Sequence, residues 1–202
     1  MHKSFILVLI LFFLALPSYS FGAQPQDVLK EAVNTIIDIL ENPDYQDSSQ
    51  KENQHQKLWD IIKNIFDFTE MSMRTLATNW KSFSPDQQKE FIDVFGRFLG
   101  NNYLGKIQSD FKGEKVVFLD QEMLSDTRAL IKTEIIRESS RIPVDYSMFD
   151  KNGTWQIYDV RIEGVSLVQN YRSQFANILL NKSPDILIEQ LKQKLNENDT
   201  SK

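Results

Sequence analysis

Apolar side chains recur every three to four residues towards both ends of the chain, but the middle follows a different pattern. Helical spacing runs through residues 27–41, 58–66 and 85–107 before the change, and through 183–195 after it. Between them, β-branched and aromatic residues gather in four short runs, at 116–119, 129–136, 144–149 and 154–162. Because the connections between these runs are short and polar, we expect an antiparallel meander. The pattern therefore predicts an α+β domain with N-terminal helices, a four-stranded sheet and C-terminal helices.

Three segments are defined by their polar or breaking residues. Residues 84–87, Ser-Pro-Asp-Gln, combine an N-cap serine, a first-turn proline and a glutamine at the third helical position, which predicts a helix start. Residues 44–57 are almost without apolar side chains, and we interpret them as an exposed linker or as the solvated start of a helix. Within 153–175 the last strand breaks at Gly164 and helical spacing resumes, so the sheet and its helical cover are expected to meet there.

The first 23 residues have the pattern of a secretory signal peptide. Lys3 gives a positive start, residues 5–16 are an unbroken apolar run, and Pro17 is followed by small side chains. The run is shorter than the roughly 20 residues that a membrane-spanning helix needs. The rest predicts a single domain at 24–196 and a frayed tail at 197–202. An exported, acidic chain without cysteine fits the bacterial periplasm, with a freely secreted protein as the alternative.

Composition and missing motifs argue against several functional classes. A net charge of −5 argues against nucleic acid as a partner, because that partner needs a basic surface. The sequence has no cysteine, glycine-rich phosphate loop or paired metal-ligand spacing, so we expect no catalytic residues, cofactor or metal. We interpret His55 as a surface residue of the polar segment. Asp145 and Asp159 are either solvent-facing strand acids or the acid–base groups of a small isomerase-type enzyme.

Aromatic side chains are concentrated on helices and strands that should face one another. They are Phe91, Phe95, Phe98, Tyr103, Tyr146, Trp155 and Tyr158. Such a set is compatible with a solid core and with an apolar ligand cavity, and the spacing alone leaves both open. Arg172 follows the point where the sheet gives way to a helix. It is either a surface arginine or a group that meets a phosphate or carboxylate at a cavity mouth.

Several of these segments, taken together, resemble one protein family. Residues 155–167, WQIYDVRIEGVSL, followed by Asn170-Tyr171-Arg172 and Phe175, resemble the MlaC or toluene-tolerance family. Residues 66–80 resemble that family's first motif, residues 88–103 its second, and residues 187–191 its terminal helix. The resemblance covers roughly residues 26–195, with the motifs in the family's order. Members of this family are periplasmic auxiliary components of the Mla-type ABC lipid transporter.

The resemblance implies a carrier without catalysis of its own, which shuttles phospholipid between the outer and inner membranes and so maintains outer-membrane lipid asymmetry. Two acyl chains are then expected in an enclosed apolar pocket between sheet and helices, with Arg172 at the headgroup. The residues expected to line the pocket are Phe91, Phe95, Phe98, Tyr103, Val144, Tyr146, Met148, Trp155, Tyr158, Val160, Val165 and Leu167. The partners implied are an inner-membrane MCE-domain protein of an ABC transporter and an outer-membrane lipoprotein complex.

Three alternatives remain at this stage. A hopanoid or sterol-like lipid is an alternative cargo, because a related branch of the family lies beside hopanoid synthesis. A cone-shaped isomerase or dehydratase would use Asp145 or Asp159 as its base. A protein-binding adaptor would have a solid core, without a cavity above about 300 Å³.

Overall fold

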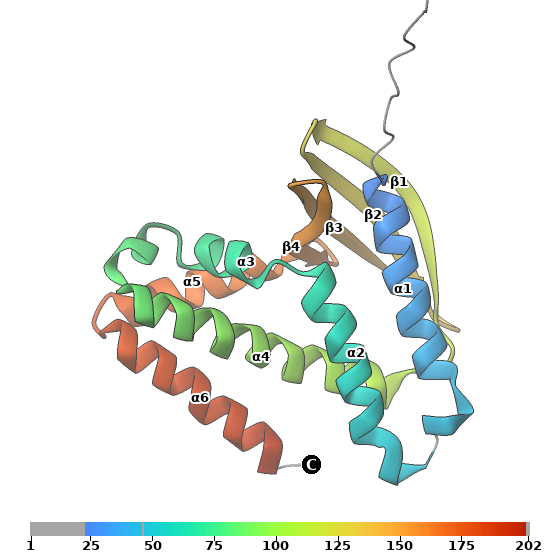
Figure 1. Ribbon diagram of the computed structural model, residues 1–202, viewed down its shortest axis with the longest axis horizontal. Coiled ribbons are helices and arrows are strands. Elements are labelled where there is room, and N and C mark those ends of the chain that lie inside the picture. The colour runs from blue at the N-terminus through green and yellow to red at the C-terminus, as the bar shows by residue number, and fades with distance from the viewer. Residues whose placement is uncertain (1–22, 46, 201–202) are drawn as a thin grey trace, which may run out of the picture.

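Six α-helices flank one antiparallel sheet in the computed structural model, which describes residues 23–45 and 47–200 (Figure 1). The α-helices are α1 (Pro25–Glu41), α2 (Lys51–Ile65), α3 (Phe68–Leu76), α4 (Pro85–Asp110), α5 (Leu167–Leu179) and α6 (Pro184–Thr200). The strands are β1 (Lys115–Ser125), β2 (Arg128–Ile136), β3 (Arg141–Lys151), β4 (Thr154–Ile162) and β5 (Val165–Ser166). The predicted α+β order of helices, sheet and helices is confirmed. The predicted signal peptide lies outside the described residues, apart from Ala23.

The sheet has five strands in the order β1-β2-β3-β4-β5, so the expectation of four strands was wrong by one short strand. Glu163 and Gly164 both adopt positive φ, 49° and 82°, as a two-residue hairpin turn requires. This turn brings the chain back for the two residues of β5, which pair with Arg161 and Ile162. The sequence pattern predicted only a break at Gly164, because two residues are too few to show an alternating pattern.

The second half of the polar segment at 44–57 is the start of a helix and not a linker. Helix α2 begins at Lys51, and Gln54 on its first turns is only 2% exposed. The Gln54 side-chain amide donates to the carbonyl of Ile39 at 2.9 Å, and its oxygen accepts from Gln108 at 2.8 Å. Because these bonds satisfy its polar atoms, a glutamine can be buried where α1, α2 and α4 meet.

The helices form a layer that extends away from the sheet, while α1 lies along the sheet (Figure 1). Helix α4 packs against α6, and α3 packs against α5. Gly100 allows α2 to approach α4 closely, because a Cβ at this position would stand 2.5 Å from a ring carbon of Trp59. The glycine that interrupts the apolar stripe of α4 is therefore a packing site for an aromatic ring. In the described part of the chain, no helix is long and apolar enough to cross a membrane.

The buried apolar side chains form two large clusters, one among the helices and one on the sheet. The helical cluster comprises Met71, Leu76, Phe83, Phe91, Val94, Phe95, Phe98, Leu99, Val168, Phe175, Leu187, Ile188, Leu191 and Leu195. The sheet cluster comprises Leu29, Ile65, Ala129, Ile131, Val144, Met148, Trp155, Ile157 and Val160. The helical cluster holds α3, α4, α5 and α6 together. The sheet cluster joins α1 and α2 to the inner face of the sheet. The domain therefore has two apolar layers that meet along a boundary.

Candidate functional site

The boundary between the two clusters is lined by aromatic and aliphatic side chains. Phe66, at the junction of α2 and α3, packs against both clusters. Leu167 packs against the sheet cluster, whereas Tyr171, one helical turn later on the same face of α5, packs against the helical cluster together with Tyr103. We call these four residues, Phe66, Tyr103, Leu167 and Tyr171, the seam. Each is only partly buried, so the seam is less tightly covered than either cluster.

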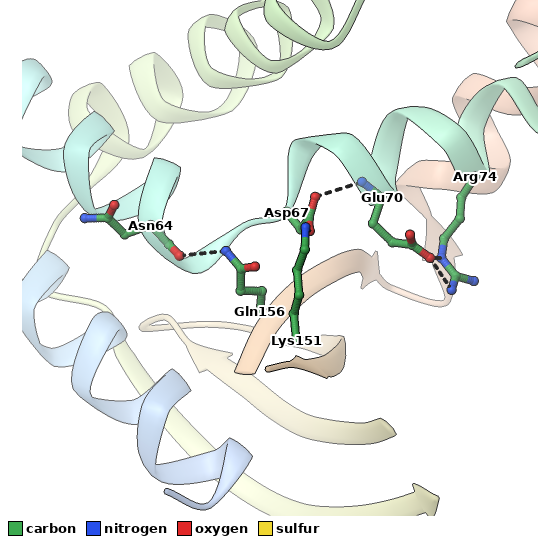
Figure 2. A network of polar contacts seen from close by, with 6 residues as sticks. All are labelled: Asn64, Asp67, Glu70, Arg74, Lys151 and Gln156. Carbon is green, nitrogen blue, oxygen red and sulfur yellow. Dashed lines mark hydrogen bonds and ion pairs between the residues drawn. The ribbon is translucent and has the colours of Figure 1, made fainter. Parts of the chain in front are cut away.

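The junction between α2 and α3 is held to the sheet by polar contacts (Figure 2). The Asp67 carboxylate caps α3 by accepting from the backbone N–H of Glu70 at 2.8 Å, and it accepts from Lys151 Nζ at 2.6 Å. The backbone N–H of Asp67 donates to the carbonyl of Ile157 at 2.9 Å. Nearby, Gln156 Nε2 donates to the carbonyl of Asn64 at 3.2 Å. These bonds fix Phe66, one residue before Asp67, against β4.

The start of α5 is fixed to β4 by Asp159. Its carboxylate accepts from the Ser166 hydroxyl at 2.6 Å and from the backbone N–H of Val168 at 3.1 Å. Ser166 in turn caps α5 by accepting from the backbone N–H of Gln169 at 3.0 Å. Asp159 thus positions Leu167 and the helical turn that follows it. This structural role explains the presence of Asp159, which was also a candidate general base.

The residues predicted to contact lipid fall into both clusters and along their boundary. Phe91, Phe95 and Phe98 are buried in the helical cluster, and Val144, Met148, Trp155 and Val160 are buried in the sheet cluster. Tyr103 and Leu167 are in the seam, and Tyr146 packs against the sheet cluster from the inner face of β3. Val165 stands apart, because it is 58% exposed on β5. The fold thus divides most of the predicted set between the two clusters, on elements distant in sequence.

Tyr146 and Tyr158 lie on different sides of the sheet. Burial raises the pKa of Tyr146 to about 12, so its hydroxyl stays neutral on the inner face at physiological pH. Tyr158 instead lies under the guanidinium of Arg74, with 4.1 Å between the guanidinium carbon and the ring centroid.

Arg172, the predicted headgroup residue, is exposed and donates from Nε to the carbonyl of Arg74 at 2.9 Å. Arg172 therefore ties α5 to α3 through one of its nitrogens.

The buried side chains of the two clusters lie between the sheet and the helices. Two hollows, of about 380 and 360 Å³, lie elsewhere, where the start of α2 meets the end of α4. Polar and charged side chains predominate among their linings, which include Lys51, Gln108 and Ser109. Both exceed about 300 Å³, but neither has the apolar lining that acyl chains require.

The other candidate polar residues have ordinary structural surroundings. His55 lies on α2 rather than in a linker, partly buried, with Nδ1 3.3 Å from Gln108 Oε1. Asp145 is partly buried on β3 and has Lys132 and Arg161 as its register partners on the neighbouring strands. Among the described residues, no group of three or more His, Cys, Asp or Glu side chains is placed to hold a metal ion.

Several residues of the sheet cluster were absent from the predicted set, namely Leu29, Ile65, Ala129, Ile131 and Ile157. Ala129 and Ile131 alternate along β2 with Leu130 and Lys132, so strand periodicity marks them as inward-facing. Leu29 has no such signal that would assign it to the sheet, because helical spacing does not reveal which element a helix will meet. Phe66 was noted only as part of a motif, and its contact with both clusters depends on the α2–α3 junction.

The sequence profile of the MlaC protein family matches residues 30–193. The chain belongs to the MlaC family. It is similar to the intermembrane phospholipid transport system binding protein MlaC of Haemophilus influenzae, with 24% identity over 125 residues. That match covers 59% of this chain and 58% of the relative, so it spans less than two thirds of the relative's length.

Two further proteins match over more of their length. Toluene tolerance protein ttg2D of Pseudomonas putida is 21% identical over 175 residues, which cover 85% of this chain and 81% of that protein. The phospholipid-binding protein of Ralstonia solanacearum, solved in complex with a phospholipid, aligns with a TM-score of 0.75 at 20% sequence identity. That alignment covers 88% of this chain and 99% of the solved chain, and it shows that the two share their fold.

Proposed function

We propose that this protein is a periplasmic phospholipid carrier that shuttles lipid between outer- and inner-membrane complexes, and so maintains outer-membrane lipid asymmetry. The observation that carries this proposal is the seam, where two large apolar layers meet through partly buried side chains. Membership of the MlaC family supports it, because a relative is named as a phospholipid transport binding protein and a protein of the same fold was solved with a phospholipid.

The energetics of acyl chains explain why such a carrier needs an interior site. Each methylene transferred from water to an apolar site contributes about 0.8 kcal/mol. Two chains of about 15 methylenes each would therefore cost roughly 24 kcal/mol if they were left in water. A row of apolar side chains on the protein surface would cover only one side of each acyl chain. A site between the sheet cluster and the helical cluster would cover both sides.

In this proposal, loading widens the space between the two clusters at the seam. The acyl chains would replace contacts that Phe66 and Leu167 make with the sheet cluster. Because the displaced contacts are also apolar, the loaded and closed forms can be close in free energy. A small difference between them allows both uptake and release, which a carrier needs.

The proposal includes no catalytic step. Asp159, which was considered as a general base, is bonded to Ser166 and Val168 at the start of α5. The partners that this role requires are an inner-membrane MCE-domain protein of an ABC transporter and an outer-membrane lipoprotein complex. An exported location in the periplasm follows from the same role.

Native mass spectrometry of the protein purified from the periplasm without detergent tests the proposal. We expect a population whose mass exceeds that of the chain by one phospholipid with two acyl chains, released on denaturation. A hopanoid mass would instead identify the sterol-like alternative. Protein that remains free of lipid, even after incubation with phospholipid vesicles, would contradict the carrier role.

A further inference from the structure

Two hydroxyls on α3 are buried without a hydrogen-bond partner. Ser72 and Thr75 are 0% and 1% exposed, and neither side-chain oxygen has a partner among the residues that the structure describes. Hydroxyls on other helices bond to their own backbone. Thr35 on α1 and Ser173 on α5 each donate to the carbonyl four residues earlier, at 2.8 and 3.1 Å. Ser72 and Thr75 do not use this bond, so each has an O–H to donate elsewhere.

Every other buried polar side chain in residues 23–45 and 47–200 has a partner within the protein. These side chains are Gln54, Asp67, Thr133 and Ser166. Thr133, which is 1% exposed, donates to the carbonyl of Val144 at 2.9 Å. A buried donor without an acceptor is unfavourable, and folded proteins leave few of them. Two such donors on one short helix therefore indicate an acceptor that does not belong to the protein's own chain.

The two hydroxyls lie on the face of α3 that begins at the seam. Phe68, Ser72 and Thr75 follow one another at helical spacing, so they share one side of the helix. Phe68 stacks on the seam residue Phe66, with 5.9 Å between the ring centroids. A Cβ at Gly96 of α4 would lie 3.2 Å from the ring of Phe68, so this face of α3 also packs closely on α4. The hydroxyls thus lie one and two helical turns beyond a residue in contact with the seam.

The surroundings of the hydroxyls favour a neutral acceptor. Met71 and Leu76, the neighbours of Ser72 and Thr75 in sequence, are buried in the helical cluster. A phosphate among these side chains would lose its water without gaining a counter-charge, which is strongly unfavourable. An ester carbonyl is a neutral acceptor, and a diacyl phospholipid carries two of them on adjacent glycerol carbons. Two donors one helical turn apart match this pair of acceptors.

We propose that Ser72 and Thr75 are reserved for the ester carbonyls of the bound phospholipid, so that they destabilise the empty protein and stabilise the loaded one. This inference rests on the proposed carrier function, and it assigns the contact that the glycerol esters make. The phosphate would then lie on the exposed side of α3, where Arg172 donates to the carbonyl of Arg74. Lipids with ether-linked chains lack these carbonyls and would bind more weakly.

Thermal unfolding of lipid-free protein tests the first half of the proposal. Ser72→Ala and Thr75→Val remove a hydroxyl that lacks an acceptor, so each is expected to raise the Tm by about 2 to 4 °C. Thr133→Val removes a buried hydroxyl that has an acceptor, and it should lower the Tm by a similar amount. A fall in Tm for both α3 variants would show that their hydroxyls are already bonded within the protein, and this would overturn the inference.

A lipid competition tests the second half. The protein is incubated with vesicles that contain equal amounts of diester and diether phosphatidylethanolamine with chains of equal length, and native mass spectrometry gives the ratio of bound lipids. Two neutral hydrogen bonds should give the wild type a preference of about 10-fold for the diester lipid. The double variant Ser72→Ala/Thr75→Val should bring this ratio close to one, without loss of diether binding.

Thr35→Val is the matched control for the competition, because it removes an exposed hydroxyl that is bonded within α1. This variant should keep the wild-type ratio. Equal binding of both lipids by the wild type, or an unchanged preference in the double variant, would overturn the inference while leaving the carrier function intact. Failure of the wild type to bind either lipid would refute the carrier function itself.

Discussion

Replacement of Ile162 by aspartate is expected to remove most of the bound phospholipid while the protein stays folded. Ile162 is the last residue of β4, partly buried against the sheet cluster, and it pairs with Val144 of β3. A carboxylate here would lie beside the acyl chains, where a charge without a partner is strongly unfavourable. In the closed form the same carboxylate can turn towards water. A penalty of about 1.4 kcal/mol already weakens binding tenfold, so we expect at least a tenfold loss.

Leu119→Asp provides the control for this experiment. Leu119 lies on β1 and is 55% exposed, so the new carboxylate there is hydrated in both the closed and the loaded forms. Both variants add one negative charge and remove one aliphatic side chain from the sheet. The amount of phospholipid per protein, measured by native mass spectrometry, should fall only for Ile162→Asp. Equal lipid content in the two variants would show that the inner face of the sheet does not contact the cargo.

The second large effect is expected on stability, from Asp67→Ala. The Asp67 side chain is 5% exposed, caps α3 and pairs with Lys151, so alanine removes a helix cap and a charge-assisted hydrogen bond together. We expect the free energy of unfolding, measured by urea denaturation, to fall by about 3 kcal/mol. The loss should affect the whole domain, because this carboxylate joins the first helix of the helical layer to the end of β3.

Asp67→Asn separates the two contributions. Its amide oxygen can still accept from the backbone N–H of Glu70, but the charge that pairs with Lys151 is gone. We therefore expect a loss between those of the wild type and the alanine variant. Lys151→Met should also destabilise, because it leaves the carboxylate buried with fewer donors. A loss below about 1 kcal/mol for Asp67→Ala would mean that the junction is held mainly by the backbone bond to Ile157.

Local sequence signals predicted the elements well, because their causes are local. Ser84 and Gln87 form the expected capping box at the start of α4, with both reciprocal hydrogen bonds present. Asn152 and Gly153 adopt positive φ, 57° and 86°, in the expected turn between β3 and β4. In both cases, the residues that determine the conformation are within four positions of one another.

The arrangement of the candidate site was harder to predict, because it depends on contacts between distant elements. Periodicity showed that Phe91, Phe95 and Phe98 share one face of a helix, but it did not show that this face meets α5 and α6 rather than the sheet. As a result, one predicted pocket lining is divided between two clusters. Likewise, the role of Asp159 required the short β5 return that places Ser166 beside it.

The most direct test of the account is a crystal structure of the protein loaded with phospholipid. We predict two acyl chains between the sheet cluster and the helical cluster, in contact with Phe66, Leu167 and Tyr146. The contacts of Asp67 with Lys151 and of Asp159 with Ser166 would be kept. A loaded structure in which the two clusters stay closed and the lipid lies on the outer surface would contradict the account.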